Sequence, residues 1–223
     1  MLNLILPSLP FAGLALVLGF KHSFDADHVV AVSGLLRRSR SLKESAAMSI
    51  SWSVGHMATA AIITALLFAF KDSILAQVLS HFELLVGVML VVIGAWSLRE
   101  LFILHKHPHS HGKVKHAHAH LHTKSADGVH FHKHFFGIGL VHGLASNDEL
   151  LLLLTAELGL TSLAGMLVGT AIFSVGVVLG MMLFSLAFTF PLLKAHSEGI
   201  SRGVTLLTGV ASVGYGAMML LGV

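Results

Sequence analysis

Four residues of this chain have the types and the spacing to bind a metal ion. Two histidines and two aspartates stand within seven positions: His22, Asp25, Asp27 and His28. Apolar runs flank this motif on both sides, so its ionisable groups would each cost several kcal/mol if lipid surrounded them. Imidazole and carboxylate groups together bind divalent transition metals such as Ni, Co or Zn. The motif therefore predicts a metal site inside a membrane span.

A straight helix would not bring both imidazoles of this motif to one ion. At the helical rise of 1.5 Å per residue, His22 and His28 would lie about 9 Å apart along the axis. Either the helix is unwound at the motif, or the two histidines serve successive positions of the ion. Unwound backbone at membrane depth is tolerated only where it is buried in protein or lines a cavity. A capping network without metal is the alternative, but two acids and two histidines exceed what a cap needs.

Two further polar groups interrupt apolar runs. His56 lies in the middle of the second run, and its occurrence in the same half of the chain as the His/Asp motif predicts that it is also a metal ligand. The second half carries a cluster that we expect to line the transport path: His142, Ser146, Asn147, Asp148 and Glu149.

Composition places the chain among helical membrane proteins. The chain has 223 residues, of which 55% are hydrophobic and 11% charged, and its mean hydropathy is +0.83. A soluble domain carries about 25% charged residues, so a water-soluble enzyme is excluded. The chain contains no cysteine, which excludes disulfides and thiolate ligands. The isoelectric point of 9.4 reflects basic loops rather than nucleic-acid binding.

Six apolar spans are expected, over about 4–36, 46–70, 82–104, 135–158, 163–193 and 204–223. Lysine and arginine concentrate in the connections after the first, third and fifth spans. Because basic loops stay inside, these three connections are predicted to be cytoplasmic and both termini to lie outside the plasma membrane.

The two halves resemble each other at an offset near 120 residues. The motif at 19–28 aligns with 139–148, Ser53-Val54-Gly55 with Ser174-Val175-Gly176, and Gly87 and Gly94-Ala95 with Gly209 and Gly216-Ala217. Three spans is an odd number, so the halves must be inverted relative to each other, as in many transporters. The predicted fold is therefore an all-α polytopic membrane protein: a three-helix repeat at 1–104, a loop at 105–134 and a second three-helix repeat at 135–223.

The segment 105–134 holds most of the 17 histidines of the chain. They form three His-x-His ladders: His105, His107, His109 and His111; His116, His118, His120 and His122; His130, His132 and His134. Such tracts bind borderline divalent ions through neutral imidazole, which predicts metal capture. The alternation resembles strand periodicity, but Pro108, Gly112 and the lysines favour a disordered cytoplasmic loop. A solvated or pH-responsive linker is the alternative.

The motif His22-x4-Asp27-His28 resembles the H-x4-D-H signature of the nickel/cobalt transporter family, and Gly55-His56 resembles its Gly-His motif in the next span. Gly180-Met181-Met182-Leu183 resembles the start of a later motif, but the acids expected after it are missing, and the second-half motif Asp-Thr-Ala-Thr-Glu is absent. With six spans instead of eight, the chain is more similar to the compact urease-accessory type of nickel permease within the six-span LysE-like superfamily. The resemblance implies that the signature selects and moves Ni²⁺ or Co²⁺.

The sequence therefore predicts a secondary transporter that carries Ni²⁺ or Co²⁺ as substrate and holds no fixed cofactor. Import is favoured, because ions would pass from outside to the histidine loop and on to cytoplasmic metallochaperones or urease accessory proteins. Export of the same ions is the alternative, and a membrane metal sensor or storage protein is a second class. The metal is not fixed among Ni, Co, Zn and Fe.

An enzyme is not expected. His22-x4-Asp27 is also the spacing of the glycerolipid acyltransferase motif, in which aspartate orients a histidine base. Those enzymes need a sizeable domain outside the membrane, and the longest loop here is a histidine tract. The H-E-x-x-H motif of a metalloprotease is absent, and so is any nucleotide-binding motif.

Overall fold

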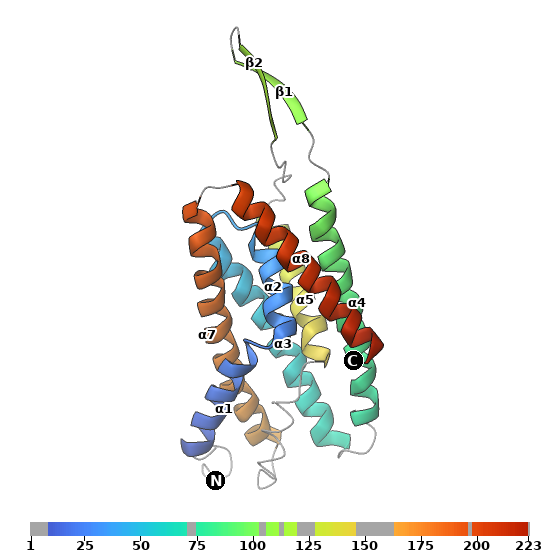
Figure 1. Cartoon of the computed structure of the whole chain (residues 1–223). Helices are drawn as coiled ribbons and strands as arrows, with labels where there is room; N and C mark the ends of the chain where they lie inside the picture. The colour runs from blue at the N-terminus through green and yellow to red at the C-terminus, as the bar shows by residue number, and fades with distance from the viewer. Residues whose placement is uncertain are drawn as a thin grey trace.

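The computed structural model describes residues 9–70, 75–102, 106–111, 114–119, 128–145, 163–195 and 198–222. Within them, seven helices and one hairpin form: α1 (Leu9–His22), α2 (Ala26–Leu36), α3 (Leu42–Phe70), α4 (Leu75–Phe102), β1 (Lys106–His111), β2 (Val114–Ala119), α5 (Gly128–Ala145), α7 (Leu163–Ala195) and α8 (Glu198–Leu221). Figure 1 shows the helices as one elongated bundle and the hairpin projecting beyond one end of it, which we call the hairpin end.

Ionisable side chains are buried in this bundle, and many large apolar side chains face outward. The most deeply buried side chains include four histidines and an aspartate, whereas large apolar side chains such as Val17, Leu183 and Leu207 are more than half exposed. Three helices are long and apolar enough to cross a membrane, over Leu42–Leu66, Leu163–Ala195 and Gly199–Leu221. A bilayer requires an apolar outer surface and internally satisfied polar groups, so extensive outward-facing apolar side chains fit a membrane protein. The prediction of a helical membrane protein is confirmed.

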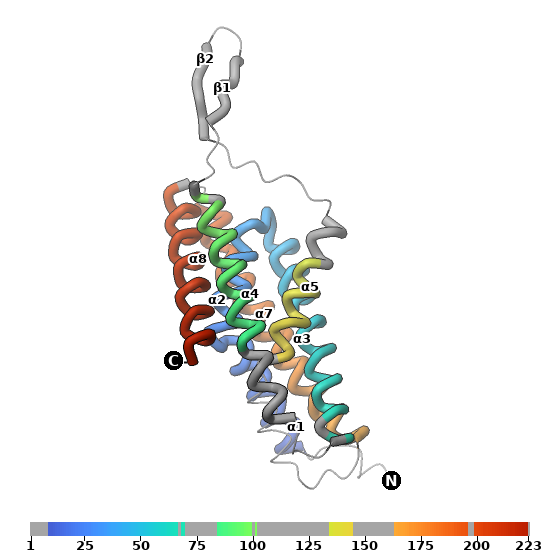
Figure 2. The backbone as a smooth tube through the Cα atoms, turned by 90° about the vertical axis from the view of Figure 1, so that its right-hand side faces the viewer, coloured from blue at the N-terminus to red at the C-terminus, as the bar shows by residue number. Residues whose placement is uncertain are grey.

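The first predicted span is broken at the His/Asp motif. Helix α1 ends at His22, a turn covers residues 23–25, and α2 begins at Ala26 with Asp25 in extended conformation at its N-cap. This break confirms the unwound alternative: the ring centroids of His22 and His28 lie 4.6 Å apart instead of being separated along one axis. From Asp27 to its end, α2 exposes no residue to the outside, and Figure 2 shows it inside the bundle.

Three seams between helices hold the bundle together: α1 with α7, α3 with α5, and α4 with α8; α3 also packs on α7. Glycines lie at each seam. A Cβ at Gly19 would collide with the carbonyl of Phe173, one at Gly139 with the carbonyl of Trp52, and one at Gly94 would lie 2.7 Å from the carbonyl of Gly209. Without a hydrophobic force between helices in lipid, such close approach supplies the packing energy.

Glycines at aligned positions of the two halves make equivalent contacts. Gly55 approaches the backbone of Phe136, and Gly176, at the aligned position, approaches that of Leu16, which aligns with Phe136. Gly94 meets Gly209, and Gly216 meets Gly87 in the same way. The glycines that the sequence comparison aligned therefore make equivalent contacts in α1–α7, α3–α5 and α4–α8.

The histidine segment differs from expectation. We expected disorder throughout 105–134, but residues 106–111 and 114–119 pair as an antiparallel hairpin, and α5 begins already at Gly128. The His-x-His alternation has the two-residue period of a strand, and this outweighs the single proline. The register sets His107 opposite His118 and His109 opposite His116. The helices α3, α4, α5 and α8 also begin several residues before the predicted spans.

Arg37 connects α2 to the α4–α8 pair at the hairpin end. This half-buried side chain follows the last residue of α2, and its Nε donates to Ser97 Oγ on α4 over 3.1 Å. Its Nη1 donates to Thr205 Oγ1 on α8 over 3.4 Å. Helix α2 is thus tied to both α4 and α8 where it leaves the bundle.

Candidate metal site

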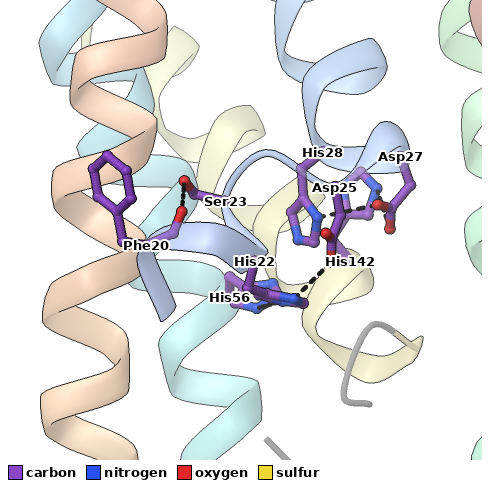
Figure 3. Close-up of polar contacts among 8 residues, drawn as sticks. All are labelled: Phe20, His22, Ser23, Asp25, Asp27, His28, His56 and His142. Atoms are coloured by element: carbon purple, nitrogen blue, oxygen red, sulfur yellow. Dashed lines mark hydrogen bonds and ion pairs between the residues drawn. The ribbon is translucent and has the colours of Figure 1, made fainter. Parts of the chain in front are cut away.

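Three imidazoles from three helices converge at the break in the first span. His22 at the end of α1, His28 in the first turns of α2 and His56 at the middle of α3 each offer a ligand nitrogen, and these nitrogens lie within 4.8 Å of one another. The Nε2 atoms of His22 and His56 are 3.4 Å apart. All three side chains are at most 1% exposed. Figure 3 shows them meeting between the two halves of the broken span. We call them the histidine cluster.

The two aspartates of the motif lie against the far nitrogens of the cluster. Asp25 Oδ2 is 2.9 Å from His22 Nδ1, and Asp27 Oδ1 is 3.1 Å from His28 Nδ1. A carboxylate hydrogen-bonded to Nδ1 would hold the proton there and leave the lone pair of Nε2 for a metal, as in carboxylate–histidine–metal arrangements. The Asp27 carboxylate is close to His28 Nδ1 but does not form a hydrogen bond with it. Asp27 is buried, whereas the Asp25 side chain is 30% exposed.

His142, which we expected to line the path, lies at the edge of the cluster. This residue is near the end of α5, is fully buried, and stacks on His28 with 5.2 Å between ring centroids. Its Nε2 lies 3.9 Å from Asp27 Oδ2, and neither ring nitrogen has a hydrogen-bond partner. A buried imidazole without a partner is costly unless something binds it. Both halves of the chain therefore contribute to one polar site.

Two aromatic residues that sequence reasoning missed enclose the site. The Trp52 ring stacks on His56 at 5.2 Å and meets His28 edge-on at 5.0 Å, while the Phe173 ring lies 5.4 Å from His22. Trp52 lies four residues before His56 and so shares its helix face, which was the available signal. Phe173 comes from α7, and no sequence signal pointed to it. These rings shield the cluster from lipid and solvent.

The arrangement suits a borderline divalent ion. Several neutral imidazoles favour Ni, Co, Zn or Cu over Mg²⁺ and Ca²⁺, which prefer oxygen ligands. The ends of two helices meet here: the negative carboxyl end of α1 attracts a cation and the positive amino end of α2 repels it. Asp27 lies in the first turn of α2, where its charge opposes that repulsion.

Several predicted residues lie outside the described residues. These are Ser146, Asn147, Asp148 and Glu149 of the second half, and His105, His120 and His122 of the histidine tract. His107, His109, His111, His116 and His118 lie in the hairpin, and His130, His132 and His134 in the first turns of α5. His134 is exposed, away from the buried cluster.

Residues 14–218 match the protein family described as "Cytochrome C biogenesis protein transmembrane region". The chain belongs to this membrane protein family. It is also similar to the "Urease accessory protein UreH" of Bacillus sp. (strain TB-90), with 33% identity over 206 residues that span 91% of this chain and 87% of the relative. No solved structure matches the chain significantly.

In this chain three histidines converge at the broken span, and the sequence contains no cysteine. The match covers almost every described helix, from within α1 to near the end of α8. Membership therefore concerns the membrane-embedded architecture as a whole, and the chemistry of this chain has to be argued from its histidine cluster.

Proposed function

We propose that the chain is a secondary transporter of Ni²⁺ or Co²⁺ and that the histidine cluster binds the ion in transit. The observation that carries the proposal is the convergence of His22, His28 and His56 at a broken span. Resemblance to the H-x4-D-H signature of nickel/cobalt transporters favours these two metals, and the relative described as a urease accessory protein supports the choice. An enzyme is not proposed, because neither the matching family nor the relative is described as one.

The proposed architecture has six spans in two inverted three-helix repeats, with both termini outside and the hairpin end in the cytoplasm. The exchange of equivalent glycine contacts between α1–α7 and α3–α5 supports the repeat. The basic residues near the hairpin end, among them Arg37, Arg40 and Lys43, support the orientation. In such folds the substrate binds where the broken helices of the two repeats meet, and His22 and His142 come from aligned positions.

Within the proposed site, the histidines bind the ion and the aspartates of the motif support them. His22, His28 and His56 are the ligands, and His142 is available as a fourth. Asp25 and Asp27, for which the sequence also suggested direct ligation, orient His22 and His28 and balance the charge of the ion. The 2.9 Å and 3.1 Å separations from the Nδ1 atoms favour this second role.

For direction we favour import, with the histidine segment as a cytoplasmic acceptor that passes ions to metallochaperones or urease accessory proteins. No part of the proposal involves nucleic acid. Export remains the opposing hypothesis, because the same segment would gather cytoplasmic ions equally well. A sensor or storage protein would bind ions without moving them.

Accumulation of ⁶³Ni²⁺ tests the proposal in cells that express the chain, beside cells with empty vector. We expect expressing cells to accumulate nickel faster. Slower accumulation with better metal tolerance would establish export, and unchanged flux with correct membrane insertion would contradict transport of nickel. A variant in which a Gly/Ser linker replaces 106–119 is expected to keep transport but to need more external nickel, if the hairpin is the acceptor.

Asp25→Asn is expected to weaken nickel binding about tenfold, the lower end of the range for outer partners of a ligand, because Asp25 is partly exposed. The amide still accepts a hydrogen bond from His22 Nδ1 but brings no charge. Equilibrium dialysis of purified protein in detergent, in the background in which the linker replaces 106–119, measures the change. Glu44→Gln, which removes an equal charge at the hairpin end, is the control and should bind normally. An unchanged affinity for Asp25→Asn would contradict the orienting role.

A further inference from the structure

The face of α3 that bears His56 continues towards the hairpin end as a row of serines. Ser53, Ser49 and Ser45 precede His56 by three, seven and eleven residues. At 100° per residue, all four positions lie within about 80° of one another around the helix. Ser49 and Ser53 are completely buried.

The hydroxyls of Ser49 and Ser53 have no hydrogen-bond partner, which they share with Ser39 in the turn after α2 but not with several other buried hydroxyls of the bundle. On the same helix, Thr59 donates to the carbonyl of Gly55 and Thr64 to that of Ala60. On α8, Ser212 donates to the carbonyl of Leu90. Burying a hydroxyl without a hydrogen-bond partner costs free energy of desolvation, unless a water molecule or a ligand binds to it.

A pair of hydroxyl groups in contact joins α3 to α7 near each end of their interface. Ser45 Oγ lies 2.9 Å from Thr189 Oγ1 and donates to the carbonyl of Ser185 at the hairpin end. Thr64 Oγ1 lies 2.9 Å from Thr170 Oγ1 beyond the cluster on the other side. Between these two pairs, the polar atoms of α3 that lack partners are Ser49 Oγ, Trp52 Nε1, Ser53 Oγ and His56 Nδ1.

We propose that Ser53 and Ser49 form a second station for the hydrated divalent cation, between the histidine cluster and the hairpin end. Their oxygens accept hydrogen bonds from the waters that the ion regains when it leaves the imidazoles. At 1.5 Å per residue, Ser53 lies about 4.5 Å and Ser49 about 10.5 Å from His56 along the axis. The Ser45–Thr189 pair is then the barrier between this station and the hairpin end. This inference rests on the proposed function for the identity of the cargo.

Cysteine accessibility tests the station, since the chain has no cysteine of its own. Ser49→Cys, Ser53→Cys and the control Ser212→Cys are each treated, in membrane vesicles of either orientation, with the small cationic thiol reagent methanethiosulfonate ethylammonium. Ser212 is as buried as the other two, but its hydroxyl is bonded within the α4–α8 seam. We expect cysteines at 49 and 53 to react at least about tenfold faster than at 212, with access from the hairpin side whenever the Ser45–Thr189 barrier opens, because only solvated thiols ionise and react.

Saturating Ni²⁺ is expected to slow the reaction at 53 more than at 49, because 53 adjoins the cluster. Equal, slow reaction at all three positions would overturn the station whatever nickel flux shows. Fast reaction at 49 and 53 that Ni²⁺ does not slow, in a chain that fails to move ⁶³Ni²⁺, would leave the hydrated station standing and refute nickel as cargo. As a second readout, Ser49→Ala/Ser53→Ala should lower the maximal rate of uptake and leave the equilibrium affinity of the cluster unchanged.

Discussion

His56→Ala is expected to reduce ⁶³Ni²⁺ flux to the empty-vector level. His56 is the proposed ligand that α3 contributes, and its Nε2 lies 3.4 Å from that of His22. Its loss leaves the two imidazoles of the broken span, with His142 beside His28. Removing an outer partner of a ligand weakens binding by up to about 100-fold, and removing a ligand itself should exceed that. The cavity left by the ring adjoins the Trp52 side chain and does not disturb a helix backbone contact.

Nickel binding by purified protein measures the same effect without transport. The histidine segment would bind nickel too and mask the change, so the dialysis uses the variant in which a linker replaces 106–119. His134→Ala is the matched control, because His134 is exposed on α5 away from the cluster. If His56→Ala bound nickel with full affinity while remaining monodisperse in detergent, the cluster would not be the cargo site.

Gly139→Val is expected to prevent correct assembly of the bundle. A Cβ at Gly139 would collide with the backbone carbonyl of Trp52 and lie 3.1 Å from the backbone nitrogen of His56. Backbone cannot swing aside as a side chain does, so we expect the upper part of the range for overpacking, about 3 kcal/mol or more. The same seam carries Trp52, His56 and His142, so metal binding should fall together with folded yield.

The control for this substitution is Gly137, two residues before Gly139 on the same helix. A Cβ at Gly137 meets nothing within 4 Å, so Gly137→Val adds the same β-branched side chain to α5 without a collision. The two variants are compared by the fraction of monodisperse protein in detergent and by its thermal aggregation midpoint. Equal yields for both would mean that α3 and α5 do not pack as closely as the glycine contacts indicate.

Those features of the candidate site that depend on a single segment of the chain could be predicted from the sequence. The polar motif in an apolar run required either a broken helix or two ion positions, and the break at 23–25 brings His22 and His28 together. His56 and His142 were recognised because an imidazole deep in a membrane span is costly without a role. The aligned glycines pointed to the seams, since small residues mark close helix contacts in membranes.

What the sequence could not decide depended on contacts between elements. Whether Asp25 and Asp27 face the ion or the Nδ1 atoms follows from the angle of the turn, which spacing alone does not fix. Phe173 reaches the cluster from α7, more than a hundred residues from the motif. In the histidine segment, the proline and glycine pointed to disorder, whereas pairing between 106–111 and 114–119 depends on cross-strand register.

Through the Arg37 contacts, α2 links the histidine cluster to the α4–α8 pair. One end of this short helix carries His28 and Asp27, and the other is fastened to α4 through Ser97 and to α8 through Thr205. A displacement of the α4–α8 pair relative to α3 and α7 therefore acts on the helix that carries His28, one of the proposed ligands. Under the proposed function, ion binding and the position of the pair then bias each other by the same free energy, as reciprocal linkage requires.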